Sequence, residues 1–197
     1  MAAGTILILS AVALILYNAY ENRSAKIASN AILAELKRSI DSKSGSEDAK
    51  TGLSNVDDTD ASAEMPIIEI NGYGYIGYLT IPVLDLSLPI MAEWDYTRLK
   101  IAPCRQFGTV AGNDLVIAGH NYLSHFGNLK TLQVGDALYF TDAAGKVVHY
   151  EVSAMEILQP TQVKEIKNSM WDLTLYTCTY GGRERVVIRC KKTSEVH

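Results

Sequence analysis

A cysteine and an arginine stand seven residues apart in the stretch LTLYTCTYGGRERVVIRC, from Leu173 to Cys190. Two apolar runs flank a Thr-Tyr-Gly-Gly turn, so the stretch predicts a β-hairpin with Cys178 ending one strand and Arg185 beginning the other. A cation beside a cysteine stabilises the thiolate and also negative charge that develops on a substrate carbonyl. The pair therefore suits nucleophilic catalysis by Cys178; the alternative interpretation is a buried, inert cysteine.

A cysteine nucleophile needs a group that carries protons, and the chain has four histidines. His120 ends the segment DLVIAGHN, where a buried strand emerges into a loop that can hold an accessible ring. His149 lies inside a predicted strand, and His197 is the last residue. We therefore predict His120 as the general acid/base, with a purely structural histidine as the alternative. His120 and His125 lack a convincing third ligand, so we predict no metal site.

Short strands separated by turn residues make up most of the chain after Met65. Seven or eight such strands with minor helical pieces predict a single all-β barrel or sandwich over residues 65–197. Helical pieces are expected near Tyr96 to Ile101 and Gly127 to Leu132. The expected strands are Tyr75–Ile81, Leu86–Met91, Leu115–Ala118, Ala137–Thr141, Val147–Ile157, Leu173–Thr177 and Val186–Cys190.

The first twenty residues, Met1 to Tyr20, carry no charged side chain. Twenty helical residues span roughly 30 Å, the thickness of the hydrocarbon core of a bilayer. We predict a transmembrane signal-anchor over residues 1–20. The alternative is a cleaved signal peptide, but no clear small-x-small cleavage site follows the apolar run. The basic residues that follow, such as Arg23 and Lys26, would favour keeping that side in the cytoplasm, so charge does not account for a barrel outside the cell.

Residues 21–64 are expected to connect this anchor to the barrel. Ser24 to Ile40 has apolar residues at roughly helical spacing, and Ser24 is a suitable cap, so a juxtamembrane helix is predicted. Asp41 to Glu64 is acidic and polar with almost nothing to bury, which is typical of a flexible linker.

Composition excludes some classes of function. The net charge of −4 leaves no basic stripe for phosphates, so no nucleic-acid partner is expected. Three cysteines are an odd number, which argues against a disulfide framework. Strand alternation places Cys190 on the face of its strand opposite to that of Arg185, so we expect Cys190 in the core. Cys104 follows Pro103 in a predicted loop, and a Cys104–Cys190 disulfide is disfavoured.

Three motifs together resemble those of sortases, the cysteine transpeptidases of Gram-positive cell surfaces. TLYTC (Thr174 to Cys178) resembles their TLxTC signature, VIAGHN (Val116 to Asn121) the histidine segment, and RVVIRCKK the arginine strand. The order His, Cys, Arg and the layout of anchor, tether and barrel also match. The segments FGNLKTLQVGDALYF and LQPTQV resemble the parts after the histidine and at the start of the substrate-side loop. The resemblance covers about Gly74 to Lys192.

The resemblance implies a closed sortase-like β-barrel of seven to eight strands and assigns roles to residues. Cys178 would be the nucleophile, His120 the general acid/base, and Arg185 the cation that stabilises the oxyanion or positions the substrate. Arg183 is the nearest rival for the arginine role. Asn121 and Thr177, beside the base and the nucleophile, are predicted substrate-binding residues, with ordinary polar strand-end residues as the alternative.

The resemblance also implies a reaction and its partners. A surface protein with a C-terminal sorting signal of Leu-Pro-x-Thr-Gly type would be cleaved and joined to an amine of a peptidoglycan precursor or a pilin lysine. No cofactor is required. Although some relatives use calcium, the chain shows no acidic cluster that suggests such a site. The expected location is the cell membrane, single-pass, with the catalytic domain extracellular.

Two departures bear on subclass, and two other functions remain open. The chain lacks an Asp-Pro-aromatic lid motif, so a pilin polymerase is less favoured, and the short Leu158 to Asp172 loop fits a haem-uptake type less well. A cysteine hydrolase on a similar barrel would differ only in using water instead of an amine. A non-catalytic surface adhesion module would use the same Cys, His and Arg structurally.

Overall fold

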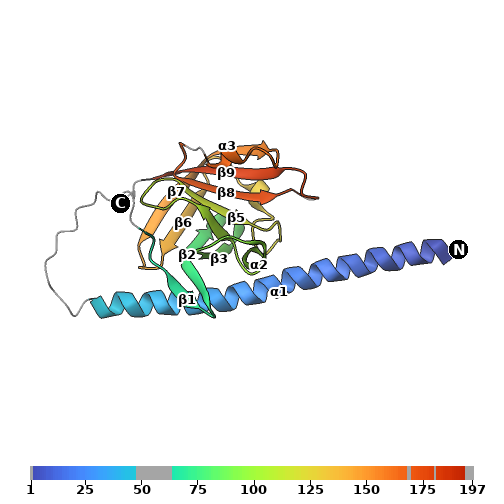
Figure 1. The fold of residues 1–197 in the computed structure, drawn as a ribbon, viewed down its shortest axis with the longest axis horizontal. Coiled ribbons are helices and arrows are strands. Elements are labelled where there is room, and N and C mark those ends of the chain that lie inside the picture. The colour runs from blue at the N-terminus through green and yellow to red at the C-terminus, as the bar shows by residue number, and fades with distance from the viewer. Residues whose placement is uncertain (1, 48–63, 168–169, 180, 194–197) are drawn as a thin grey trace.

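Nine strands form one sheet whose ends meet, so that the strands enclose a barrel (Figure 1). The computed structural model describes residues 2–47, 64–167, 170–179 and 181–193. The barrel follows the order β2-β3-β4-β5-β8-β9-β7-β6 and closes because β6 pairs antiparallel with β2, while β1 adds to the edge of β2. The strands are β1 (Ile68–Ile70), β2 (Tyr73–Ile81), β3 (Leu86–Met91), β4 (Cys104–Phe107), β5 (Leu115–Gly119), β6 (Ala137–Asp142), β7 (Val147–Leu158), β8 (Leu173–Cys178) and β9 (Arg185–Lys192).

The predicted closed barrel and all seven predicted strands are confirmed, and the structure adds elements that were not expected. The two expected helical pieces are α2 (Tyr96–Leu99) and the 3-10 turn η2 (Leu129–Thr131). Strands β1 and β4, helix α3 (Val163–Lys167) and the 3-10 turn η1 (Pro82–Leu84) were not predicted. Cys104 was expected in a loop but begins β4, where it pairs with Ala118. A strand of four residues shows too little alternation to be predicted from its own sequence.

Alternating side chains of β5, β8 and β9 separate an inner face from an outer face. Ile117, Leu175 and Ile188 belong to the main core inside the barrel, and each is 0% exposed. Burying one such side chain contributes about 1.5–3 kcal/mol. The intervening residues, such as Val116 and Val187, lie on the outer face, where Ile166 of α3 covers them.

A long helix, α1 (Ala2–Glu47), runs along one side of the barrel (Figure 1). Ile32, Leu36 and Ile40 are four residues apart, so they share one face of the helix, and all three are buried against a second core cluster that includes Tyr75 and Met91. Residues 24–40 are helical as predicted and belong to the folded unit, but Ser24 lies inside α1 and does not cap the start of a helix. The helix continues to Glu47, past the predicted start of the flexible linker; the rest of that linker, 48–63, lies outside the described residues.

The first part of α1 coincides with the predicted membrane anchor. Within the described part of the chain, no helix combines the length and apolar character needed to cross a membrane. The predicted transmembrane segment over residues 1–20 is not confirmed.

Candidate active site

The β8–β9 hairpin places Cys178 directly opposite Arg185 in the register of the two strands. The turn is closed by hydrogen bonds from the backbone N–H of Thr179 to the carbonyl of Glu184 (2.9 Å) and from that of Gly182 to the carbonyl of Thr179 (2.8 Å). Gly181 and Gly182 have φ of 82° and 71°, left-handed conformations that glycine adopts without a steric cost. The two glycines thus account for the tight turn that was predicted.

His120 joins this pair because β5 runs parallel to β8. Their register aligns Gly119 with Thr177, so His120, directly after β5, and Cys178, the last residue of β8, lie at the same end of the two strands. The structure therefore brings together His120, Cys178 and Arg185 at one edge of the barrel.

Cys178 and Arg185 also share the outer face of the sheet. Tyr176, two residues before Cys178, and Val187, two residues after Arg185, both pack in the outer cluster. Cys178 is half-buried. Thr177 points to the opposite face by alternation and is only 3% exposed, which does not favour its predicted role in substrate binding.

The guanidinium of Arg185 stays at the barrel edge through bonds to its own turn. Its Nη1 donates to the carbonyl oxygens of Gly182 (3.2 Å) and Glu184 (3.1 Å). Arg183, the rival for the arginine role, is exposed in the turn before β9 begins. The strand register therefore favours Arg185 as the partner of Cys178.

The loop after β5 packs closely around its own backbone. The N–H of Phe126 donates to the carbonyl of His120 (3.0 Å), and Phe126 is 0% exposed. A Cβ at Gly119 would lie 2.4 Å from the Phe126 ring, so only glycine fits directly before His120. Asn121, the other predicted substrate-binding residue, follows His120 and is half-buried.

The half-buried ring of His120 stacks on the ring of Tyr122. The ring centroids are 4.6 Å apart, and the rings are 17° from parallel. Burial lowers the pKa of His120, the positive charge of Lys100 lowers it further, and the carboxylate of Glu21 opposes both effects. A lowered pKa favours the neutral imidazole, the form that can accept a proton.

His125 lies in the same loop but is closed to solvent. Its side chain is 0% exposed, and burial lowers its pKa to about 4. Within the described ranges, no group of three or more His, Cys, Asp or Glu side chains is placed to hold a metal ion.

The other two cysteines are unsuited to nucleophilic chemistry. Cys104 and Cys190 are free thiols that are 0% exposed, and burial raises the pKa of Cys104 to about 12 and also raises that of Cys190. The prediction that Cys190 lies in the core is confirmed. The thiolate is the reactive form of cysteine, and burial disfavours it at Cys104 and Cys190. Cys178 is half-buried and is therefore the most accessible thiol of the three.

A small buried apolar cluster lies under α3 on the outer face, on the strands that carry Cys178 and Arg185. Val116, Val187 and Ile166 of α3 are 1%, 0% and 5% exposed, and Phe107 and Tyr176 are partly buried against them. A groove of about 600 Å³ continues from Phe107; its lining is Ala92, Glu93, Trp94, Arg105, Gln106, Phe107 and Gly108. Tyr176 Oη donates to Gln106 Oε1 and so links β8 to the lining of this groove.

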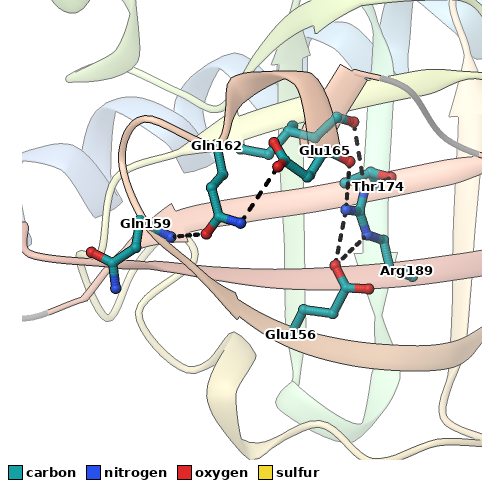
Figure 2. A network of polar contacts seen from close by, with 7 residues as sticks. Glu156, Gln159, Gln162, Glu165, Thr174 and Arg189 are labelled. Atoms are coloured by element: carbon teal, nitrogen blue, oxygen red, sulfur yellow. Dashed lines mark hydrogen bonds and ion pairs between the residues drawn. The ribbon is translucent and has the colours of Figure 1, made fainter.

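Arg189 holds α3 against the outer face (Figure 2). Its side chain is 3% exposed, and Nε and Nη2 donate to Glu156 Oε2 at 3.1 and 2.9 Å. Nη1 donates to Thr174 Oγ1 (3.2 Å), and the guanidinium also reaches the carbonyls of Glu165 (2.7 Å) and Ile166 (3.4 Å). One arginine therefore ties together β7, β8, β9 and the segment that covers the outer face.

The segment before α3 carries its own polar contacts. The N–H of Gln159 donates to Gln162 Oε1 (2.7 Å), and Gln162 Nε2 reaches Glu165 Oε1 at 3.5 Å (Figure 2). Arg189 was not predicted as a site residue, although its position four residues after Arg185 on one strand places both on the same face. Tyr122 was not predicted either, and nothing in the local sequence indicates its contact with the histidine.

Comparison with known proteins agrees with this geometry. A family model described as the sortase domain matches residues 79–193, a range that contains His120, Cys178 and Arg185. No curated protein matches the chain.

Solved sortase structures match as well. Sortase C1 from Streptococcus suis is 27% identical with a TM-score of 0.55, over 62% of this chain and 74% of that chain. Sortase C-1 from Streptococcus pneumoniae is 28% identical with a TM-score of 0.54, over 61% and 67%. A Clostridium perfringens sortase D5 transpeptidase has a TM-score of 0.61 over 85% and 99%, and at 19% identity it supports the fold. Since the family model spans more than half of the 197 residues, the chain belongs to the sortase family of transpeptidases.

Proposed function

We propose that the chain is a cysteine transpeptidase that cleaves a Leu-Pro-x-Thr-Gly-like sorting signal through a thioacyl-enzyme on Cys178 and joins it to an amine. The observation that carries the proposal is the strand register, which gathers His120, Cys178 and Arg185 at one edge of the barrel. Family membership supports transpeptidation in general. The nucleophile, the signal and the acceptor are part of the proposal.

The first half-reaction forms the thioacyl-enzyme. His120 takes the proton of the Cys178 thiol, and the resulting thiolate attacks the Thr carbonyl of the signal. A C–S bond forms, and the Arg185 guanidinium stabilises the oxyanion. The Thr–Gly C–N bond then breaks, and His120 gives its proton to the leaving amine. The acyl group remains on Cys178 as a thioester.

The second half-reaction transfers the acyl group. The acceptor amine attacks the thioester carbonyl, His120 takes a proton from the amine, and the C–S bond breaks to regenerate Cys178. The product is a new amide, and neither step needs a metal or an organic cofactor. Water in place of the amine would give a hydrolase with the same residues.

The outer face supports recognition of an extended, partly apolar peptide. The groove that continues from Phe107 is linked to β8 through Tyr176, and its lining includes Ala92, Trp94 and Phe107, so Leu and Pro of a signal could bury apolar area there. Asn121, beside His120, stays a proposed contact with the signal. Thr177 is proposed only through its backbone, because its side chain is buried.

The partners and the location belong to the same proposal. Sorting-signal proteins and an amine of a peptidoglycan precursor would meet the barrel outside the cell, with residues 1–20 attaching the chain to the membrane. Support comes from α1, where Leu7, Leu9, Ile15 and Leu16 are 72%, 64%, 66% and 64% exposed. Alkaline extraction of membranes from cells that express the full chain tests this: the chain stays in the pellet if residues 1–20 anchor it, and release into the supernatant contradicts anchoring.

The catalytic proposal is tested by incubating the full chain with a panel of Leu-Pro-x-Thr-Gly-like peptides and an amine, with mass spectrometry of the products. Peptide cleaved after Thr and joined to the amine is expected, and it should be absent with Cys178→Ala and His120→Ala variants that retain the wild-type Tm. Cleavage that no amine diverts would favour the hydrolase. No cleavage of any peptide, together with a Cys178 that resists thiol reagents, would favour the adhesion module.

A further inference from the structure

The helix that precedes the barrel contacts the loop that carries the candidate general acid/base. Glu21 of α1 accepts a hydrogen bond at Oε2 from Tyr122 Oη (2.9 Å) and another at Oε1 from Tyr17 Oη (3.0 Å). Both oxygens of the Glu21 carboxylate are therefore occupied, which fixes its position.

Asn22 makes a second link to the same loop. Its Oδ1 accepts from the backbone N–H of Ser124 (3.1 Å) and from Ser124 Oγ (3.0 Å). Ser124 Oγ also lies 3.2 Å from the carbonyl oxygen of Asn22. Two consecutive helix residues thus hold two residues of the loop, and more than 100 positions separate the partners in the sequence.

Tyr122 transmits this contact to His120. Its ring lies 4.6 Å from the His120 ring and 17° from parallel, so one face of the imidazole rests on the phenol that Glu21 holds. Further along α1, Leu36 is fully buried against the barrel, which fixes the helix as a support.

From these contacts we propose that Tyr122 is a positioning residue for His120, and that Glu21 and Asn22 of α1 hold Tyr122 and its loop in place. The inference rests on the proposed transpeptidase function, in which His120 carries protons. It makes the helix before the barrel a part of the catalytic machinery rather than a tether.

Charges around His120 add a second consequence. The groups that interact with it are Glu21 from α1, Lys100 after α2, and Tyr122 and His125 from its own loop, while Cys178 and Arg185 lie at the same end of β8 and β9. Glu21 raises the pKa of His120, and Lys100 lowers it. The hydrogen bond from Tyr122 is the main cause that lowers the pKa of Glu21, and the pKa of Tyr122 is raised to about 12. At neutral pH Glu21 is therefore ionised, and Tyr122 keeps the proton that it donates.

The test uses the full chain, three variants of the proposed contacts and one control variant. Tyr122→Phe keeps the stack and loses the bond to Glu21, Tyr122→Ala loses both, and Glu21→Gln removes the charge. Glu35→Gln is the matched control, because it removes one carboxylate from an exposed position on the same helix. The kcat and KM of peptide ligation are measured for each variant whose Tm matches that of the wild type. The pKa of His120 is measured independently by NMR titration of the histidine ring.

We expect kcat to fall about tenfold in Tyr122→Ala and about threefold in Tyr122→Phe and Glu21→Gln, a part of the 10²–10⁴ that acid–base catalysis supplies. KM should stay within about twofold, because a positioning residue does not contact the signal. In Glu21→Gln the pKa of His120 should fall, since the charge that raises it is gone, whereas Glu35→Gln should match the wild type.

Wild-type kcat and an unchanged His120 titration in Tyr122→Ala and Glu21→Gln would overturn the inference while leaving the proposed function intact, provided that His120→Ala is inactive. If His120→Ala ligates as well as the wild type, the proposed role of His120 fails first, and the inference fails with it. The NMR titration tests the Glu21 contact separately, whether or not ligation is observed.

Discussion

Arg185 lies directly opposite Cys178 across the β8–β9 pair, and both residues face the outer side of the barrel. Cβ atoms of residues paired in this way are about 5 Å apart, within reach of a guanidinium. The pairing therefore sets Arg185 and Cys178 side by side on neighbouring strands, and it is the geometric basis of the proposed chemistry.

The two arginines of the turn allow a direct test of this pairing. Arg185→Ala should lower kcat/KM about 10²–10³-fold, the usual cost of removing one oxyanion donor. Arg183→Ala should stay within about threefold, because Arg183 is exposed and precedes β9. The measurement is steady-state ligation kinetics of both variants. A larger loss with Arg183→Ala would reassign the arginine role.

The ion pair between Arg189 and Glu156 should support the segment over the outer face. Glu156→Gln replaces a charged acceptor of a buried arginine, and we expect the free energy of unfolding to fall by about 1–3 kcal/mol. Glu151→Gln, an exposed carboxylate of the same strand, is the control and should change it by less than about 0.5 kcal/mol. Urea unfolding measures both, and equal effects would argue against the network.

Helix α1 should contribute to the stability of the whole fold. Leu36→Ala removes a fully buried side chain from the second core cluster, and we expect a loss of about 2–5 kcal/mol. Ile27→Ala, on the same helix but 62% exposed, should cost less than about 1 kcal/mol. Thermal unfolding of the full chain compares them. A Leu36→Ala variant as stable as the wild type would mean that α1 does not pack on the barrel in solution.

The buried His125 should make the fold sensitive to acid. Its pKa is about 4 when folded against a usual 6.5, so the unfolded chain binds more protons between these values. The contribution is complete above pH 6.5 and is lost as the pH falls toward 4, which amounts to about 2 kcal/mol at pH 5. Urea unfolding at pH 7.5 and 5.0 should show this loss in the wild type and a smaller one in His125→Asn. Identical losses in both proteins would exclude His125 as the cause.

The barrel and the positions of its key residues could be predicted because their signals are local. The hairpin around Gly181 and Gly182 shows apolar alternation and turn chemistry within one short stretch, and the apolar run of β5 ends directly before His120. The order of the His, Cys and Arg motifs then indicated that His120 and Cys178 share a site. The parallel pairing of β5 with β8 is the structural reason that the two residues lie at the same end of the barrel.

The missed features depend on contacts between distant parts of the chain. The bond from Tyr122 to Glu21 joins residues 101 positions apart, and no pattern around either residue indicates it. The end of the helix was also misplaced, because the polar composition after Ile40 favoured a linker while α1 continues to Glu47. Arg189 could have been found by strand parity, but its partners on α3 could not, since α3 is a helix of five residues with no clear periodicity.

The central claim, that Cys178 is the nucleophile, is tested most directly by finding which cysteine becomes acylated. The full chain is incubated without an amine, together with a sorting-signal peptide that it cleaves, and intact mass followed by peptide mapping locates the adduct. We predict one thioester, on Cys178, that an added amine discharges with formation of the ligated product. An adduct on Cys104 or Cys190, or wild-type activity in a Cys178→Ala variant, would contradict the claim.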